Sequence, residues 1–149
     1  MAKIALVADS TADLPEDLRK KWNIHVIPLK VRFGSEEYYD HEITSEEFYR
    51  RLEEADELPK TSQPSPEEFM NLYRELLGDY QEVISVHLSS ALSGTLNAAN
   101  IAKERLKANI HIVDSKTISL GFGLMVVDIA RRIREGMDSV QIIDGMSKV

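Results

Sequence analysis

The chain has 149 residues, of which 43% are hydrophobic and 29% are charged, and its formal net charge is −7. This length and composition suit one globular domain with a buried core, and the absence of cysteine excludes disulfides and thiolate chemistry and is typical of a cytoplasmic protein. The negative charge argues against nucleic acid and anionic membranes as partners, and the short apolar run before Asp9 predicts neither a signal peptide nor a membrane span.

In chain order, short apolar runs alternate with helix signals. The run Lys3–Asp9 predicts a buried parallel strand, and Asp13 is expected to cap the helix that follows it. The segment Ile24–Phe33 is rich in β-branched residues and contains Pro28, which predicts one edge or irregular strand. Residues 34–43 then indicate a turn and a second short extended piece.

Two helix starts carry capping signals. Thr44 and Glu47 match a capping box at the start of a helix over Ser45–Ala55. Residues 56–66 are expected to form a proline-bearing loop, and Ser65 is expected to cap a helix that ends near residue 77.

The second half repeats the alternation of strands and helices. We expect strands at Glu82–Leu88 and Asn109–Ser115 and helices at Leu96–Lys107, Leu124–Glu135 and Ser139–Met146. Such an order predicts an α/β fold, with a mostly parallel sheet flanked by helices, in a single domain over residues 1–149.

Four polar loops follow strands or precede helices, at Asp9–Pro15, Thr61–Pro66, Leu88–Thr95 and Asp114–Gly123. In an open α/β sheet, ligands bind at the carboxyl ends of the strands, where such loops meet. These loops are rich in serine and threonine and contain no histidine. Hydroxyls and backbone N–H groups at a helix N-terminus suit a carboxylate or a phosphate monoanion.

The alternative for each loop taken alone is a simple helix cap, which Ser93, Ser65 and Asp13 are each able to provide. Gly94 allows the backbone either to approach a ligand closely or to adopt a positive φ. Four such loops at one edge favour the anion site over four unrelated caps.

Several chemistries are excluded by missing motifs. The chain contains neither a Walker A sequence nor G-x-G-x-x-G, and "ALSGT" departs from the nucleophile elbow at Ala91. No pair of histidines has the spacing of metal ligands, so no metal site is predicted. Most of the histidines lie in predicted strands, which favours a role in the core or on a sheet face. The four are His25, His41, His87 and His111.

One enzymatic alternative stays open. Ser93 or Thr61 would be the nucleophile of a hydrolase or transferase, and His87, six residues before Ser93, would be the activating base.

Together the four loop sequences resemble those of the DegV family of bacterial fatty-acid-binding proteins. The matching segments are "VADSTADLP", "KTSQPSPEEF", "HLSSALSGTLNAA" and "VDSKTISLGFG", in the family's order and spacing, and the resemblance runs from Lys3 to about Ser147. It implies two α/β domains with a lipid between them, of which this chain is the N-terminal domain and lacks the second. It also implies a binding protein, not an enzyme, without cofactor or metal, that presents a long-chain fatty acid to a fatty acid kinase for acyl-phosphate formation.

The resemblance also implies which residues hold the ligand. Thr61 and Ser93 are expected to donate hydroxyl hydrogen bonds to the fatty acid carboxylate, and Ser62, Gly94 and Thr95 to add side-chain or backbone donors. Weaker candidates for lining the ligand come from the first and fourth loops: Ser10, Thr11, Ser119 and Gly121.

The absent second domain affects the expected affinity. Each buried CH₂ group contributes about 0.8 kcal/mol, so an acyl chain that stays in water binds weakly, and we expect the chain alone to bind fatty acid weakly or not at all. A further alternative is an isolated domain with no activity of its own, whose apolar face, left open by the missing domain, leads to self-association.

Overall fold

The computed structural model of the chain describes residues 2–147. Its main sheet has four strands, all parallel, which is the α/β architecture that the sequence predicted. In spatial order these strands are β2 (Ile24–Ile27), β1 (Ala2–Asp9), β6 (Tyr80–His87) and β7 (Ile110–Asp114). The two central strands, β1 and β6, are covered on both faces, which is why they form nearly continuous apolar runs in the sequence.

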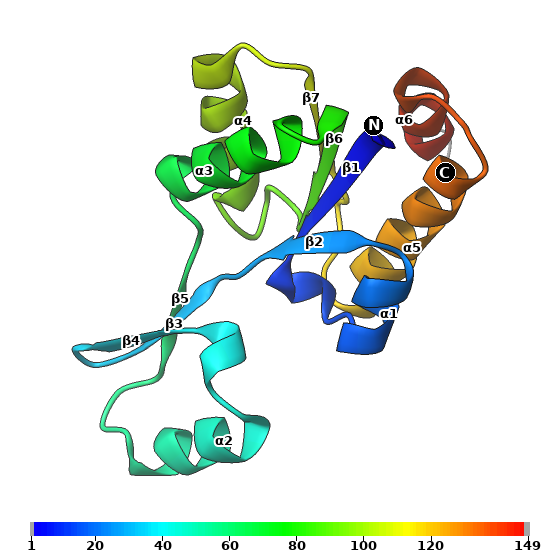
Figure 1. Cartoon of the computed structure of the whole chain (residues 1–149). Helices are drawn as coiled ribbons and strands as arrows, with labels where there is room; N and C mark the ends of the chain where they lie inside the picture. Colours follow the sequence, from blue (N-terminus) through cyan, green and yellow to red (C-terminus); the bar gives the residue numbers. More distant parts are fainter. Residues whose placement is uncertain (1, 148–149) are drawn as a thin grey trace.

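Helices cover both faces of this sheet (Figure 1). On one face Ala5 and Val7 of β1 pack with residues of α3 and α4. On the other face Ile4 and Leu6 pack with residues of α5 and α6. The alternation follows from the strand period of two. The helices of the main body are α1 (Glu16–Lys21), α3 (Pro66–Leu77), α4 (Thr95–Leu106), α5 (Leu120–Arg134) and α6 (Ser139–Ser147).

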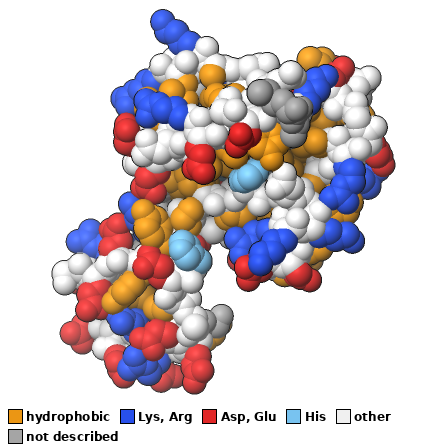
Figure 2. All heavy atoms as spheres, in the orientation of Figure 1, with side chains coloured by type: hydrophobic (Ala, Val, Ile, Leu, Met, Phe, Trp, Pro, Cys, Tyr) orange, Lys and Arg blue, Asp and Glu red, His pale blue; other side chains and the backbone are white. Residues whose placement is uncertain are grey.

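A small lobe projects from the main body (Figure 1). It contains α2 (Ser45–Glu54) and an antiparallel sheet in the order β4-β3-β5. The three strands are β3 (Lys30–Phe33), β4 (Glu36–Tyr39) and β5 (Lys60–Ser62). Figure 2 shows charged side chains over much of this lobe and hydrophobic side chains where it joins the main body.

Two predictions in this region are wrong. The single strand expected over Ile24–Phe33 is divided into β2 and β3, because Pro28 lacks an N–H group and the chain leaves the main sheet there. The loop expected over residues 56–66 contains β5, where Thr61 pairs with Val31 of β3. That pairing is invisible in the local sequence because the partners are far apart along the chain.

The capping signals are largely confirmed. Thr44 accepts a hydrogen bond from the N–H of Glu47 at 3.1 Å, but the Glu47 side chain pairs with Arg50 and Arg51, so only half of that capping box forms. Ser65 and Glu68 form both halves at the start of α3.

Two expected helix starts are corrected. Asp13 has φ 51° and ends the 3₁₀ turn η1 (Ser10–Ala12), whereas α1 begins at Glu16 with no side-chain cap. Helix α5 begins at Leu120, four residues earlier than expected. Its first turn includes Gly123, which was expected to lie in a loop but allows the helix to pack closely on η1.

Candidate functional site

The four polar loops meet at the carboxyl edge of the main sheet. The N–H of Ser119 donates to the carbonyl of Thr11 at 3.1 Å, which joins the first loop to the fourth. The N–H of Ser89 donates to the carbonyl of Thr117 at 3.1 Å, which joins the third to the fourth. The second loop reaches the third through Gln63, a residue to which the sequence assigned no role.

Gln63 explains the glycine at position 94. A Cβ atom placed on Gly94 would collide with the side-chain amide of Gln63, coming within 2.8 Å of its Nε2, so glycine permits this approach without displacing Gln63. Gly94 has a φ of −83°, so the expected positive φ is not adopted. The close contact found here is with Gln63, and the approach to a ligand stays a prediction. The contact connects the segment that carries Thr61 and Ser62 with the segment that carries Ser93.

Ser93 and Thr95 form a hydroxyl pair at the start of α4. The N-cap of this helix is Gly94, not Ser93, and it has no side-chain cap. Ser93 Oγ accepts the N–H of Thr95 at 3.2 Å and lies 2.8 Å from Thr95 Oγ1. Thr95 is fully buried and Ser93 is half-buried. When Thr95 donates to Ser93, the hydroxyl proton of Ser93 is free to point outward toward a ligand.

Thr61 and Ser62 are exposed residues of β5. Successive side chains of a strand point to opposite faces, so the two hydroxyls do not share one face. Thr61 is paired with Val31 and Ser62 with Lys30, whose ammonium lies 2.9 Å from Glu68.

The weaker candidates are tied into the loops themselves. Ser10 Oγ accepts the N–H of Leu29 at 2.9 Å, and Thr11 Oγ1 donates to Asp9. Ser119 Oγ donates to Asp13 at 3.1 Å. Gly121 lies in the first turn of α5. The Ser119 bond joins the fourth loop to the first, the Ser10 bond joins the first loop to the segment after β2, and the Thr11 bond lies within the first loop.

One carboxyl group near the first loop has an altered pKa. Burial raises the pKa of Asp40, and a hydrogen bond from Ser10 opposes this change. Asp40 and Ser10 also line a cavity of about 400 Å³ beside η1. Its lining includes Arg19 and His41, two residues that the sequence did not assign to any site.

His87 does not serve Ser93 as a base in this geometry. It is fully buried, with Nε2 2.6 Å from Ser85 Oγ and Nδ1 3.0 Å from Asp9 Oδ2. Both ring nitrogens are therefore bound inside the core, the role that the sequence favoured for strand histidines. The Asp9 partnership was not foreseen, although Asp9 and His87 each end one of the two central strands.

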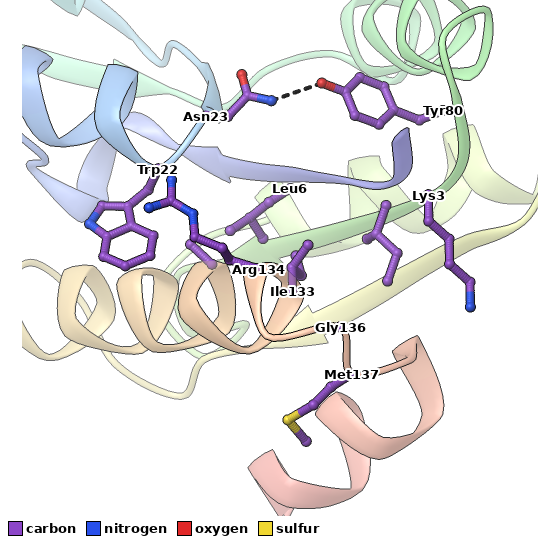
Figure 3. Close-up of a pocket in the computed structure, with 11 residues that line it drawn as sticks. Lys3, Leu6, Trp22, Asn23, Tyr80, Ile133, Arg134, Gly136 and Met137 are labelled. Atoms are coloured by element: carbon purple, nitrogen blue, oxygen red, sulfur yellow. Dashed lines mark hydrogen bonds between the residues drawn. The ribbon is translucent and has the colours of Figure 1, made fainter. Parts of the chain in front are cut away.

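A further cavity, of about 320 Å³, opens at the amino end of the sheet (Figure 3). Trp22 and Arg134 lie on one side of it, with the guanidinium carbon 4.2 Å from the ring centroid, and Asn23 donates to Tyr80 at 2.9 Å. The cavity also includes Lys3 near the start of β1, and its lining contains none of the predicted site residues. It is separate from the loops at the carboxyl edge.

Exposed apolar side chains surround the loops at the carboxyl edge. They belong to the segments that follow β6 and β7 and to the start of α5. These four residues, called the apolar rim below, are Leu92, Ile118, Leu120 and Leu124. Large exposed aliphatic side chains beside a hydroxyl-rich loop suit a ligand with a polar head and an apolar tail.

Metal-binding clusters and membrane spans are both missing from the described part of the chain. Within residues 2–147, no group of three or more histidine, aspartate or glutamate side chains is placed to hold a metal ion. Over the same residues, no helix has the length and apolar character needed to cross a membrane.

Comparison with known proteins gives consistent matches. The model of the DegV family, described as uncharacterised, matches residues 3–149. A DegV domain-containing protein of Staphylococcus aureus strain MRSA252 is 44% identical over 144 residues, which cover 96% of this chain and 51% of that protein. A DegV domain-containing 15.5 kDa protein of the same species is 42% identical over 134 residues, or 89% of this chain and 95% of that protein.

Solved structures agree with these matches. A DegV protein of Thermus thermophilus, described by its fatty acid binding, superimposes with a TM-score of 0.92 at 38% identity, over 98% of this chain and 52% of that one. DegV of Bacillus subtilis, described as a fatty-acid-binding protein, gives a TM-score of 0.91 at 38% identity, over 99% and 54%. The chain spans about half the length of most of the relatives described here.

Proposed function

The chain belongs to the DegV family, and from that premise we propose that it binds a long-chain fatty acid through its carboxylate, at the loops on the carboxyl edge of its sheet. The observation that carries the proposal is the Ser93–Thr95 hydroxyl pair beside the Gln63–Gly94 contact, because Ser93 can donate to a ligand when Thr95 donates to Ser93. The fold shared with the fatty-acid-binding proteins of T. thermophilus and B. subtilis supports it.

The carboxylate would be held by neutral donors. We assign the hydroxyls of Thr61 and Ser93 as the main donors. The backbone N–H groups of Ser62 and Gly94 are the additional donors, since the Ser62 side chain points to the other face of β5. Thr95 is buried and acts through Ser93. A hydrogen bond to a charged group contributes about 1.5–3 kcal/mol, and the N-terminus of the twelve-residue helix α4 adds a favourable dipole.

The acyl tail would run over the apolar rim. Leu92, Ile118, Leu120 and Leu124 are exposed next to the loops, and covering such side chains with a hydrocarbon chain removes apolar area from water on both partners. The rim therefore gives the tail a direction away from the hydroxyls.

The chemistry that follows binding belongs to a partner in this proposal. The chain presents the fatty acid, and a fatty acid kinase in the cytoplasm phosphorylates the carboxylate, so the chain itself has no catalytic residue. The buried state of His87 and the occupation of both its ring nitrogens support a binding role over the hydrolase alternative.

An NMR titration with octanoate tests the carboxylate site. We expect the largest amide shifts at residues 61–63 and 93–95, and we expect Ser93→Ala and Thr61→Ala each to weaken binding about tenfold, because each removes a donor to a charged group. Ser35→Ala, at an exposed turn residue of the small lobe, is the matched control and should bind as the natural chain does. Binding of 1-octanol as tight as that of octanoate would contradict a carboxylate site.

A further inference from the structure

A chain of hydrogen bonds runs through the core beneath the loops. Tyr73 Oη donates to Ser85 Oγ at 2.7 Å, Ser85 Oγ lies 2.6 Å from His87 Nε2, and His87 Nδ1 lies 3.0 Å from Asp9 Oδ2. All four residues are fully buried. Burying polar groups in this way is costly unless each has a hydrogen-bond partner. We therefore asked what these four side chains do besides fill the core.

The donors and acceptors of this chain fit one arrangement of protons. Because Tyr73 donates to Ser85, the hydroxyl proton of Ser85 is free to point at Nε2 of His87. A neutral imidazole protonated on Nδ1 then accepts from Ser85 and donates to Asp9. Every proton is thus directed toward the Asp9 carboxylate, and each bond polarises the next.

The Asp9 carboxylate also accepts hydrogen bonds from two of the loops. Its Oδ1 accepts the N–H of Thr11 at 3.0 Å and also the Thr11 hydroxyl, and its Oδ2 accepts the N–H of Leu88 at 3.1 Å. Thr11 belongs to the turn after β1, and Leu88 is the first residue of the loop that leads to Ser93. One buried carboxylate therefore ties both loops to the ends of the two central strands.

The backbone of His87 extends this tie to the fourth loop. The N–H of Ser115 donates to the carbonyl of His87 at 3.0 Å. A shift of His87 would therefore displace hydrogen-bond partners in the loops after β1, β6 and β7 at the same time.

From this geometry we propose that Asp9 and His87 are positioning residues for the carboxylate site, although neither touches the ligand. The inference rests on the proposed function. The imidazole holds the Asp9 carboxylate in place. The carboxylate in turn fixes the position of the Thr11 turn and of the loop that carries Ser93. Loss of the Nδ1 donor would leave a buried carboxylate short of one hydrogen bond, and the loops would move to compensate.

Substitution at His87 separates positioning from packing. His87→Leu fills the space without a donor, whereas His87→Asn places an amide N–H close to the position of Nδ1 and restores the bond to Asp9. We expect His87→Leu to raise amide hydrogen exchange at Thr11 and at residues 88–95 and to weaken octanoate binding about tenfold. His87→Asn should bring both measurements back toward those of the natural chain.

The control is a second histidine–carboxylate pair at the other end of the sheet. His111 Nε2 lies 3.1 Å from Glu82 Oε1, so His111→Leu removes a similar bond far from the loops. It should lower stability while leaving exchange in residues 88–95 and octanoate binding unchanged. Equal loop exchange in His87→Leu and in the natural chain, or no recovery in His87→Asn, would overturn the inference.

Two possible failures of these experiments still give a clear result. If the natural chain binds no octanoate, the proposed function fails, but loop exchange in the variants still decides whether His87 positions the loops. If His87→Leu does not fold, the ¹⁵N spectrum of the natural imidazole decides. A proton on Nδ1, protected from exchange with water, supports the inference, and a proton on Nε2 overturns it.

Discussion

At the scale of single residues, the hydroxyls near the site have different tasks. Ser93 Oγ accepts the N–H of Thr95, and when the Thr95 hydroxyl also donates to it, the Ser93 proton is free for a ligand. The hydroxyls of Ser10, Thr11 and Ser119 instead form hydrogen bonds within the protein, to Leu29, Asp9 and Asp13 respectively. A sequence rich in serine and threonine predicts a hydroxyl-rich site, and the structure shows which of these hydroxyls already have partners in the surrounding loops.

His25 predicts a pH dependence of stability. Burial lowers the pKa of His25 from its ordinary value of 6.5, and the carboxylate of Glu75 opposes this only in part. The unfolded chain therefore binds the proton more readily, and the free energy of unfolding contributed by His25 falls as the pH drops below about 6.5.

Urea unfolding between pH 8 and pH 5 measures this effect. His25→Phe keeps a ring beside Tyr80, whose centroid lies 6.0 Å away, and should flatten the dependence. His41→Gln, at an exposed position, serves as the control and should follow the natural chain. An identical pH profile for His25→Phe and the natural chain would count against a lowered pKa.

At the scale of elements, the site depends on how closely helix starts approach strand ends. The first turn of α5 packs on η1, and a Cβ atom added to Gly123 would lie 2.7 Å from the carbonyl oxygen of Ala12. A backbone atom cannot rotate away as a side chain does, so this contact sets the distance between the first and fourth loops.

Gly123→Ala should therefore destabilise the chain, by about 1–3 kcal/mol, as overpacking in a core does. Gly121→Ala is the matched control in the same helical turn. There the Cβ atom would meet the side chain of Thr117 at 2.9 Å, which is free to turn, and alanine has the better helix propensity. Urea denaturation of both variants measures the difference, and equal stabilities would show that the α5–η1 contact is looser than described.

At the scale of the whole molecule, the main sheet brings the loops after β1, β6 and β7 to one edge. The second loop joins them through the contact of Gln63 with Gly94, and an apolar rim lies beside them. The rim residues Leu92, Ile118, Leu120 and Leu124 are exposed. They support either a tail-binding surface or self-association through this face, and self-association stays a prediction.

The open rim predicts a low affinity for long fatty acids in the 149-residue chain. Each CH₂ group that stays in water forgoes about 0.8 kcal/mol, and the few hydrogen bonds to the carboxylate do not replace that contribution. Native mass spectrometry of the purified chain with oleate should show little or no bound lipid. One oleate retained per chain after purification would refute the prediction, and bovine serum albumin under the same conditions is a positive control.

The positions of the loops that form the candidate site were largely predictable from sequence, because strand ends and cap residues are local features. The loops at Leu88–Thr95 and Asp114–Gly123 are recognisable in the sequence, since each follows an apolar strand. The contribution of Gln63 is not recognisable in the sequence, because it depends on the contact of its side chain with Gly94 in the folded chain. The pairing of Asp9 with His87 is equally hidden, because the two residues are brought together by the adjacent alignment of β1 and β6.

The sequence by itself determined the α/β architecture, the central strands and the caps at Thr44 and Ser65, because hydrophobic periodicity and capping act within a few residues. Tertiary structure alone decided that the chain leaves the main sheet at Pro28, that β5 pairs with β3, and that α5 starts at Leu120. It also decided that Asp9 serves three partners. These outcomes depend on contacts between distant segments, whose free energy no local pattern encodes.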